Sequence, residues 1–414
     1  MLDINFIKEN LELCKLAAKN KYREVEWEKL LSLDETRRKL IKSVDDLRAK
    51  RNETSRKPIE EAREEGKQIK ESLKGLEEEL RKVEEELQVL ILTVPNVPDK
   101  SAPVGKDSSG NVEVRKWGDM PVFDFTIKDH IELAKINDLI DFERGTKVGG
   151  FRAYFLKHEA VLLEMGILWY MMRKLTSKGY IPLMAPSLVK EFTLFGSGQF
   201  PWGRDEVYHL EKDDMYLAGT AEVPVTAYLS DEVLIEKEMP MKFVAFSPCF
   251  RREAGSYGKD TKGIYRLHQF NKIEQVIIST ADSSKSLTLL EELLANAEEI
   301  LQDLKLPYRV LSMCTGDMGE AQVKKYDIET WMPSRNAYGE TMSDSFMGDF
   351  QARRLKIRYR GKDGKMQFCH TLNNTAIASP RILIPILENY QQKDGSIRVP
   401  DVLVPFVGKD VISR

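Results

Sequence analysis

The segment from residue 250 to residue 274, FRREAGSYGKDTKGIYRLHQFNKIE, concentrates positive charge in a chain whose net charge is only -3. Arginine and lysine side chains bind phosphate oxygens, and arginine does so through two parallel hydrogen bonds. Glycines between them let a loop approach a ligand closely. The pattern favours a phosphate-binding loop between two strands, although a solvated surface loop has the same composition. The residues concerned are Arg251, Arg252, Lys259, Lys262, Arg266 and Lys272, with Gly255, Gly258 and Gly263.

Side-chain alternation along a strand predicts which way the first side chains of this segment point. If the strand before the loop continues through Glu253, then Arg251 and Glu253 lie on one face of it and Arg252 lies on the other. We therefore expect Arg251 and Glu253 to point the same way.

A further arginine lies in TLNNTAIASPRILIPILENY, residues 371 to 390. Pro380 suits the first position of a helix, which would set Arg381 at the helix start. An arginine there opposes the helix dipole unless an anion or a carboxylate neutralises it. Pro385 lies further into this predicted helix, where a proline removes a backbone hydrogen bond and bends the helix.

The elements that carry these residues follow an N-terminal region in which the spacing of hydrophobic residues is different. Two runs of residues in alternating steps of four and three predict the seam of a coiled coil. Pro58 separates the runs and would end a helix, so we expect one antiparallel helical hairpin. The first run is Leu33, Arg37, Leu40, Val44, Leu47, Arg51 and Thr54, and the second is Ile69, Leu73, Leu76, Leu80, Val83, Leu87 and Leu90.

Charge is distributed unevenly over this hairpin. Residues 35 to 57 hold nine basic and four acidic side chains, and residues 71 to 90 hold three basic and seven acidic ones. Two explanations stay open. The helices neutralise each other's charge by pairing, or one side of the hairpin presents cations to an RNA backbone.

The segment from residue 92 to residue 111, LTVPNVPDKSAPVGKDSSGN, marks a domain boundary because it is rich in proline, glycine, serine and aspartate. We expect a helical arm over 1–100, a linker over 101–110 and a second domain over 111–414. Alternating strands and amphipathic stretches at 154–177 and 284–304 predict an α+β fold with a mostly antiparallel sheet flanked by helices. The glycine motifs of Rossmann and P-loop folds are absent from the sequence.

Composition narrows the class of protein further. No apolar run approaches the roughly 18 residues that cross a membrane, and the N-terminus lacks the order of a signal peptide, so we expect a cytoplasmic protein without membrane attachment. A pI near 6.1 excludes a protein that coats nucleic acid. Four widely spaced cysteines are expected to be reduced and mostly buried, and these are Cys14, Cys249, Cys314 and Cys369.

Several stretches of the chain resemble class II aminoacyl-tRNA synthetases. The segments 250–274 and 371–390 resemble motifs 2 and 3 of that class, and LTSKGYIPLMAPSLVK with Pro186 resembles motif 1. More narrowly, GTAEVPVTAYLSDE, FRREAGSYGKDTKG, HQFNKIE, DFQARR and the preceding hairpin resemble bacterial-type seryl-tRNA synthetases. The resemblance covers essentially the whole chain.

The resemblance implies an enzyme that activates L-serine with ATP and Mg²⁺ and transfers it to tRNA(Ser), with tRNA(Sec) as a further candidate. It also implies a homodimer formed through motif 1 and a tRNA-binding arm. Two alternatives are kept: an adenylating paralogue that loads a carrier protein, and an inactive coiled-coil RNA-binding protein. The long hairpin argues against the first, and the presence of Arg251, Glu253, Glu340 and Arg381 argues against the second.

The resemblance also assigns roles to individual residues. Arg251 would hold the α-phosphate and the serine carboxylate, Arg381 the far end of ATP, and both would be catalytic. Glu253 would receive the adenine amino group and Phe270 would stack on the ring. Lys259, Lys262 and Arg266 would lie on or beyond a flap that meets the tRNA acceptor end or closes over ATP. The implied ATP site is Arg251, Arg252, Glu253, Phe270, Glu340, Thr341, Met342, Ser343 and Arg381, with Glu340 and Ser343 as metal ligands; the implied serine site is Thr220, Ala221, Glu222, Arg251, Glu274 and Thr375.

The sequence departs from the family pattern in motif 3. The bacterial pattern is close to NGSGLAVGR, where this chain has NNTAIASPR at 373–381. Thr375 keeps a hydroxyl for serine, whereas Asn374 and Pro380 are expected to alter the floor of the pocket. ETMSDS likewise replaces a more serine-rich segment.

Overall fold

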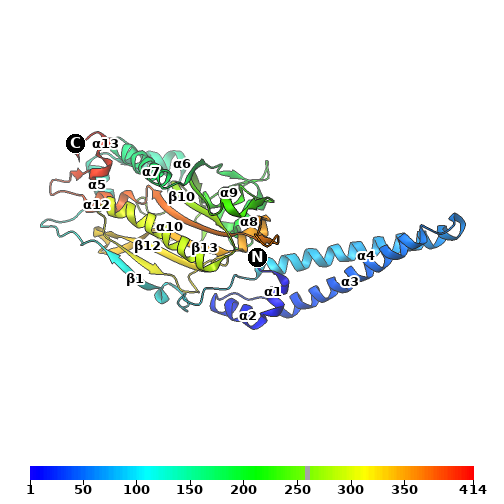
Figure 1. Cartoon of the computed structure of the whole chain (residues 1–414). Coiled ribbons are helices and arrows are strands. Elements are labelled where there is room, and N and C mark those ends of the chain that lie inside the picture. Colours follow the sequence, from blue (N-terminus) through cyan, green and yellow to red (C-terminus); the bar gives the residue numbers. More distant parts are fainter. Residues whose placement is uncertain (257–261) are drawn as a thin grey trace. The chain divides into compact units, whose positions relative to one another are not determined.

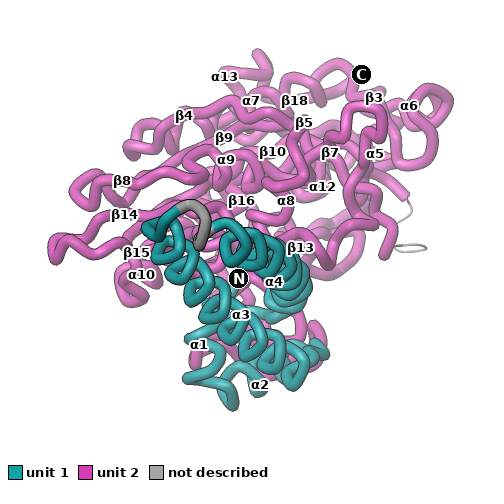
Figure 2. The backbone as a smooth tube through the Cα atoms, turned by 90° about the vertical axis from the view of Figure 1, so that its right-hand side faces the viewer, with its two compact units in different colours: residues 1–97 teal, residues 98–414 magenta. Residues whose placement is uncertain are grey.

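A computed structural model describes residues 1–256 and 262–414 of the chain (Figure 1). The chain divides into two compact units, Met1–Val97 and Pro98–Arg414 (Figure 2). The expectations for Gly258 and Lys259 fall outside the described residues. Among the described residues, no helix is long and apolar enough to cross a membrane.

The first unit is helical, and two long helices form its hairpin. The alternating seam residues are buried or half-buried along both helices, with Arg51 as the exposed exception. Val44, Ile69 and Leu73 form the buried centre of this seam, which confirms the predicted coiled-coil hairpin. Pro58 immediately precedes the second helix, where its missing N–H costs nothing. The helices are α1 (Ile4–Glu9), α2 (Leu11–Asn20), α3 (Trp27–Thr54) and α4 (Ile59–Thr93).

Ion pairs between α3 and α4 neutralise part of the basic charge on α3. Arg48 Nη2 lies 2.9 Å from Glu77 Oε1, and Lys50 Nζ lies 3.6 Å from Glu65 Oε1. Elsewhere on α3, Asp34 is fully buried and forms ion pairs with Arg37, Arg38 and Lys8. Helix pairing therefore explains only some of the basic residues.

The second unit is built on a sheet of eight strands. In the described part of the chain, every neighbouring pair in this sheet is antiparallel except β4 with β9, which confirms the mostly antiparallel prediction. The order across the sheet is β1 (Val112–Trp117), β11 (Tyr308–Ser312), β12 (Lys324–Met332), β13 (Ala337–Gly348), β16 (His370–Ser379), β10 (Gln269–Ser279), β9 (Met241–Phe250) and β4 (Ile181–Met184).

Helices α7 (Glu159–Ser177) and α10 (Ser283–Asp303) cover one face of this sheet (Figure 1). Leu163 of α7 and Leu293 of α10 belong to the same buried cluster as Ile273 and Ile277 of β10. A second buried cluster joins Val276, from the opposite face of β10, to α9 and α11. Because side chains alternate along β10, Phe270, Lys272 and Glu274 share the face of Val276 and point away from α10.

Short elements surround this framework. The remaining helices are α5 (His130–Ile136), α6 (Phe142–Gly149), α8 (Glu191–Ser197), α9 (Glu222–Ala227), α11 (Phe350–Leu355), α12 (Leu383–Asn389) and α13 (Val404–Val407). The short strands are β2 (Ile140–Asp141), β3 (Phe155–Leu156), β5 (Leu188–Val189), β6 (Tyr208–Leu210), β7 (Met215–Leu217), β8 (Val233–Ile235), β14 (Arg358–Arg360), β15 (Met366–Phe368), β17 (Ile397–Arg398) and β18 (Val411–Ile412). Single 3-10 turns are η1 (Ser108–Gly110), η2 (Arg204–Glu206), η3 (Glu236–Glu238), η4 (Ala254–Ser256), η5 (Pro333–Arg335) and η6 (Asp401–Leu403).

Two local predictions are wrong. β9 ends at Phe250, so Arg251, Arg252 and Glu253 follow the strand and strand alternation does not orient them. The helix of motif 3 begins at Leu383, so Arg381 lies in the turn before it. Pro385 is then the third helical residue, where no backbone hydrogen bond exists for proline to remove. The four cysteines are buried and unpaired, as predicted.

Candidate active site

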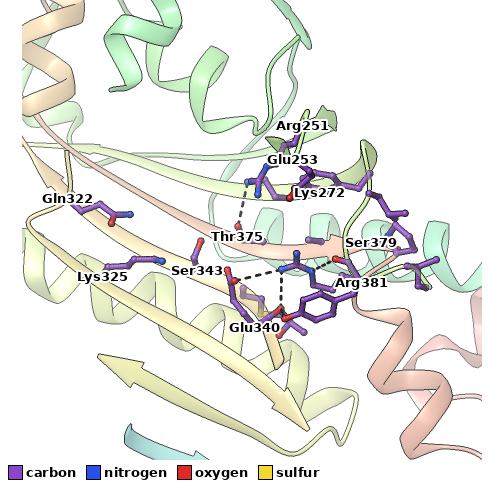
Figure 3. Close-up of a pocket in the computed structure, with 18 residues that line it drawn as sticks. Arg251, Glu253, Lys272, Gln322, Lys325, Glu340, Ser343, Thr375, Ser379 and Arg381 are labelled. Atoms are coloured by element: carbon purple, nitrogen blue, oxygen red, sulfur yellow. Dashed lines mark hydrogen bonds and ion pairs between the residues drawn. The ribbon is translucent and has the colours of Figure 1, made fainter. Parts of the chain in front are cut away.

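A cavity of about 260 Å³ opens on the face of the sheet that carries Phe270 and Lys272 (Figure 3). It lies over β10, β13 and β16 and is bounded by the residues that follow β9 and β16. Its lining comprises Arg251, Glu253, Ile264, Tyr265, Leu267, Phe270, Lys272, Gln322, Lys325, Glu340, Thr341, Met342, Ser343, Thr375, Ala378, Ser379, Pro380 and Arg381. Both arginines expected to be catalytic therefore meet at one cavity.

Two β-bulges align residues that regular strands would keep apart. Opposite β12, the register of β13 shifts between Met342 and Glu340, so Thr341 is an extra residue. Glu340 and Ser343 are three positions apart and would face opposite ways in a regular strand, yet both line the cavity. The same shift in β16 at Ala376 brings Thr375 and Ala378 to the cavity.

Neutral groups hold the head of Arg251. Its Nε donates to the carbonyl oxygen of Gly219 at 3.2 Å, and its guanidinium carbon lies 5.2 Å from the ring centre of Phe270. No described carboxylate lies within ion-pair distance of Arg251. The charge of this arginine is therefore available to an anion in the cavity.

Arg381 is held at the other side of the cavity (Figure 3). It donates through Nε to the carbonyl oxygen of Tyr265 at 3.0 Å and through Nη1 to that of Glu340 at 3.1 Å. Its guanidinium carbon lies 4.4 Å from the Tyr265 ring centre. The carboxylate of Glu340 is 3.9 Å away, which is the neutralising partner that the sequence left open.

The surroundings of Glu340 favour its ionised form. Partial desolvation disfavours the charge, although 47% of the side chain is exposed, and the positive charges of Arg381, Lys325 and Arg251 outweigh that effect and hold the pKa of Glu340 below its usual value. An ionised carboxylate and the hydroxyl of Ser343 on one stretch of β13 are oxygen donors of the kind that Mg²⁺ prefers. These two residues thus fit a divalent ion.

The residues expected to bind serine gather around a lysine that was not predicted for this site. Lys272 Nζ lies 2.6 Å from Thr220 Oγ1, 2.6 Å from Glu274 Oε2 and 3.5 Å from Thr375 Oγ1. Thr220 and Glu274 are buried behind Lys272 and Thr375, which line the cavity. The signal for Lys272 was present in HQFNKIE, because alternate residues of a strand share a face.

Glu222 occupies the first turn of α9, close to this group. Its Oε1 accepts a hydrogen bond from Gln351 Nε2 at 2.8 Å, and its backbone N–H donates to Thr220 Oγ1. Burial, together with the charge of Glu274, raises the pKa of Glu222 to about 7. Ala221 directly before it is fully buried in the core.

Two arginines around the motif 2 loop take positions that the sequence did not specify. Arg266 pairs with Glu253 across the loop, Nη1 to Oε2 at 2.9 Å, so Arg266 lies beside the adenine-binding candidate. Arg252 is exposed and is not part of the cavity lining, although its backbone N–H donates to Glu206. Lys262 is exposed.

Of the two motif 3 residues that depart from the family pattern at the predicted pocket floor, one lies away from the cavity and the other lines it. Asn374 is fully buried on the α10 side of the sheet, where its Oδ1 accepts from Gln275 Nε2 at 2.7 Å. Its side chain therefore does not form the pocket floor, contrary to prediction. Pro380 does line the cavity. Other lining residues that the sequence reasoning missed are Tyr265, Gln322, Lys325 and Ser379.

Comparisons with known proteins bear on both units. The family described as "Seryl-tRNA synthetase N-terminal domain" matches residues 1–98, and "tRNA synthetase class II core domain (G, H, P, S and T)" matches residues 206–390. A serine--tRNA ligase from Deinococcus radiodurans is 46% identical over 415 residues, which are 99% of this chain and 98% of that protein. One from Thermotoga petrophila is 46% identical over the full length of both chains.

Solved structures agree over the same span. Seryl-tRNA synthetase from Pyrococcus horikoshii, complexed with ATP, is similar with a TM-score of 0.93 and 37% identity, covering 100% of this chain and 99% of that one. Cytoplasmic serine-tRNA ligase from Naegleria fowleri, in complex with AMP, has a TM-score of 0.89 and 32% identity, covering 100% of this chain and 99% of that one. With both units matched end to end, the chain belongs to the bacterial-type seryl-tRNA synthetases of the class II aminoacyl-tRNA synthetase family.

Proposed function

We propose that this protein activates L-serine with ATP to form seryl-adenylate and pyrophosphate, and then transfers serine to tRNA(Ser). The observation that carries the proposal is one cavity in which two arginines and an ionised glutamate adjoin a buried cluster of hydroxyl and carboxyl groups. The first set suits a polyphosphate, and the second suits a small amino acid with a hydroxyl. tRNA(Sec) is a further candidate substrate.

The activation step needs positioning and charge stabilisation more than a general base. The serine carboxylate attacks the α-phosphorus in line, and negative charge builds on the α-phosphate oxygens. Arg251, whose charge no described carboxylate neutralises, would hold the serine carboxylate and the α-phosphate together. Arg381 would bind the far phosphates, Glu253 the adenine amino group, and Phe270 the ring face.

Mg²⁺ is the cofactor we propose for the phosphate side of the cavity. Glu340 and Ser343, brought to one face by the bulge at Thr341, would hold the ion. When bound, it would neutralise phosphate charge and fix the conformation of ATP. The chain's own part is to keep Glu340 ionised through Arg381, Lys325 and Arg251.

The N-terminal arm, residues 1–100, is our candidate for the tRNA-binding element, joined through 101–110 to a catalytic domain over 111–414. Several basic residues of α3 are exposed and make no ion pair with a described acidic side chain of α4, for example Lys42. Such cations are free to meet phosphates. A cytoplasmic location completes the proposal, as expected for a partner of tRNA.

We also propose that two copies of the chain assemble through the motif 1 region. Leu162, Met165 and Trp169 follow helical spacing along α7, and their exposed fractions are 44%, 59% and 56%. A contiguous apolar helix face of this kind is typical of an oligomer interface.

Exchange of pyrophosphate into ATP tests the activation step. Exchange should depend on serine and Mg²⁺, and charging of total tRNA with a panel of amino acids should select serine. Exchange with another amino acid but not with serine would contradict the proposal. Exchange without tRNA charging would favour the carrier-loading alternative, and no exchange at all would favour an inactive RNA-binding protein.

A further inference from the structure

Lys272 is buried at the centre of the group of residues assigned to serine. Only 3% of its surface is exposed, and its ammonium contacts Thr220, Glu274 and Thr375. Figure 3 shows Lys272 and Thr375 at the cavity. Burying an ammonium is costly unless a carboxylate pairs with it. Lys272 and Glu274, 2.6 Å apart, therefore form a fixed pair of opposite charges inside the proposed site.

Oε2 of Glu274 already contacts a buried cation, so a second ammonium at that oxygen would compete with Lys272. Glu274 is 1% exposed, and its Oε2 receives both the ammonium of Lys272 and, at 3.4 Å, the hydroxyl of Thr375. Glu222 differs, because it is half-buried and its Oε1 accepts a neutral hydrogen bond from Gln351. Among the described residues, no lysine or arginine pairs with Glu222.

We propose, on the basis of the function proposed above, that Lys272 is a positioning residue of the amino-acid site: it neutralises Glu274 and so leaves Glu222 to receive the α-ammonium of serine. With serine bound, two carboxylates then meet two ammonium groups. Without Lys272, the single ammonium group of serine would face two buried carboxylates, and one of these carboxylates would have no cation to pair with. Lys272 also holds Glu274 and Thr375 in place, so that both can form hydrogen bonds with the serine hydroxyl.

This division of roles makes serine binding depend on pH. Glu222 must lose its proton before it can receive an ammonium group, and its pKa is about 7. Serine binding should therefore weaken as pH falls through 7 and reach a plateau above it. The charged and hydrogen-bonding groups that act on Glu222 are Glu274 and Lys272 of β10, Arg251 after β9 and Gln351 of α11.

The substitution Lys272→Met in the full chain tests the proposal, since methionine keeps the length of the side chain and removes its charge. Loss of a charged hydrogen-bonding partner predicts a rise of about 10- to 100-fold in KM for serine in pyrophosphate exchange. The KM for ATP should stay within about twofold. The acidic limb of kcat/KM for serine should move to higher pH, because a cation that favours the ionised form of Glu222 is gone.

Lys242→Met is the matched control. Lys242 also lies in the sheet, on β9, and its ammonium pairs with Glu292 at 2.7 Å, away from the cavity. We expect this variant to keep the wild-type KM and pH profile. Thermal unfolding of both variants separates a lost fold from a raised KM, and Lys272→Gln, also uncharged, is measured if the methionine variant does not fold.

A double variant tests the neutralising role directly. Glu274→Gln in the Lys272→Met background removes both charges of the pair, so KM for serine should return part of the way towards wild type. A serine KM at or below wild type in Lys272→Met, with an unchanged acidic limb, would overturn the proposal while serine activation stands. A wild-type protein that does not activate serine would overturn the proposed function itself.

Discussion

At the scale of single residues, the two arginines of the cavity differ in what restrains them. Arg251 is held by the carbonyl oxygen of Gly219 and the ring of Phe270, both neutral groups. Arg381 also lies near an ionised carboxylate, that of Glu340. We infer that Arg251 offers the larger uncompensated charge to the reacting phosphate, and that Arg381 and Glu340 act together on the distal phosphates.

Arg251→Lys should reduce serine activation by about 100- to 1000-fold, because lysine keeps the charge but cannot donate two parallel hydrogen bonds to phosphate and carboxylate. Pyrophosphate exchange at saturating serine and ATP measures the change. Arg360→Lys is the matched control, since Arg360 is exposed on β14 outside the cavity, and its activity should be close to wild type. Equal effects of the two substitutions would contradict the role given to Arg251.

At the scale of elements, α12 holds the motif 3 turn through one buried carboxylate. Glu388 of α12 accepts hydrogen bonds from the backbone N–H and Nδ1 of His130 and from the backbone N–H and Oγ of Ser334. These donors come from α5 and η5, so a single side chain joins three short elements. Arg381 lies two residues before the start of this helix, which makes its position dependent on the same contacts.

Glu388→Ala should lower the free energy of unfolding by about 3 kcal/mol, because several buried donors lose their acceptor at once. Chemical denaturation followed by tryptophan fluorescence measures the loss. Glu388→Gln keeps the size and one carbonyl acceptor, so we expect a smaller loss. If the alanine and glutamine variants were as stable as wild type, the carboxylate would not be what holds α12.

The exposed cations of α3 carry the prediction for the arm. Lys42→Glu combined with Arg51→Glu should raise KM for tRNA at least about tenfold at low salt, with a smaller effect at high salt, because phosphate contacts release counterions. Pyrophosphate exchange should not change. Neither residue pairs with a described acidic side chain, so the substitutions spare the hairpin's ion pairs.

The matched control for the arm is Lys70→Glu with Lys74→Glu, two exposed positions on α4. We expect it to affect tRNA charging less than the α3 variant does. Deletion of residues 27–95 should remove tRNA charging and spare activation. Unchanged charging after that deletion would show that the arm is not the tRNA-binding element.

At the scale of the whole molecule, the proposed homodimer rests on the exposed apolar face of α7. Met165→Glu with Trp169→Glu places two charges on this face, and we expect the protein to become monomeric in analytical ultracentrifugation. Lys362→Glu, an exposed position in the loop between β14 and β15, is the control and should stay dimeric. A double variant that remains a dimer would place the interface elsewhere, and a monomeric wild type would contradict the proposed homodimer.

Much of this architecture could be predicted from the sequence, because its signals are local. The period of 3.5 residues places Val44, Ile69 and Leu73 on one stripe of a helix pair, and burial of that stripe requires only the two helices themselves. Alternation in HQFNKIE likewise sets Phe270 and Glu274 on one face of a strand. Recognition of the family motifs predicted which arginines and which glutamate meet in one cavity.

Tertiary structure decided what depends on partners far away in the sequence. The bulges at Thr341 and Ala376 exist only in the pairing with β12 and β10, and they alone bring Glu340 beside Ser343 and Thr375 beside Ala378. Likewise, β9 ends at Phe250 and α12 begins at Leu383, so Arg251 and Arg381 lie outside these elements, and the backbone N–H of Arg251 donates to the carbonyl oxygen of His268. The sequence by itself determined which chemical groups this protein has and the period that orders them. Only the tertiary structure decided that Lys272 meets Glu274, Thr220 and Thr375, because the contact between β10, β16 and the start of α9 forms only when distant segments fold together.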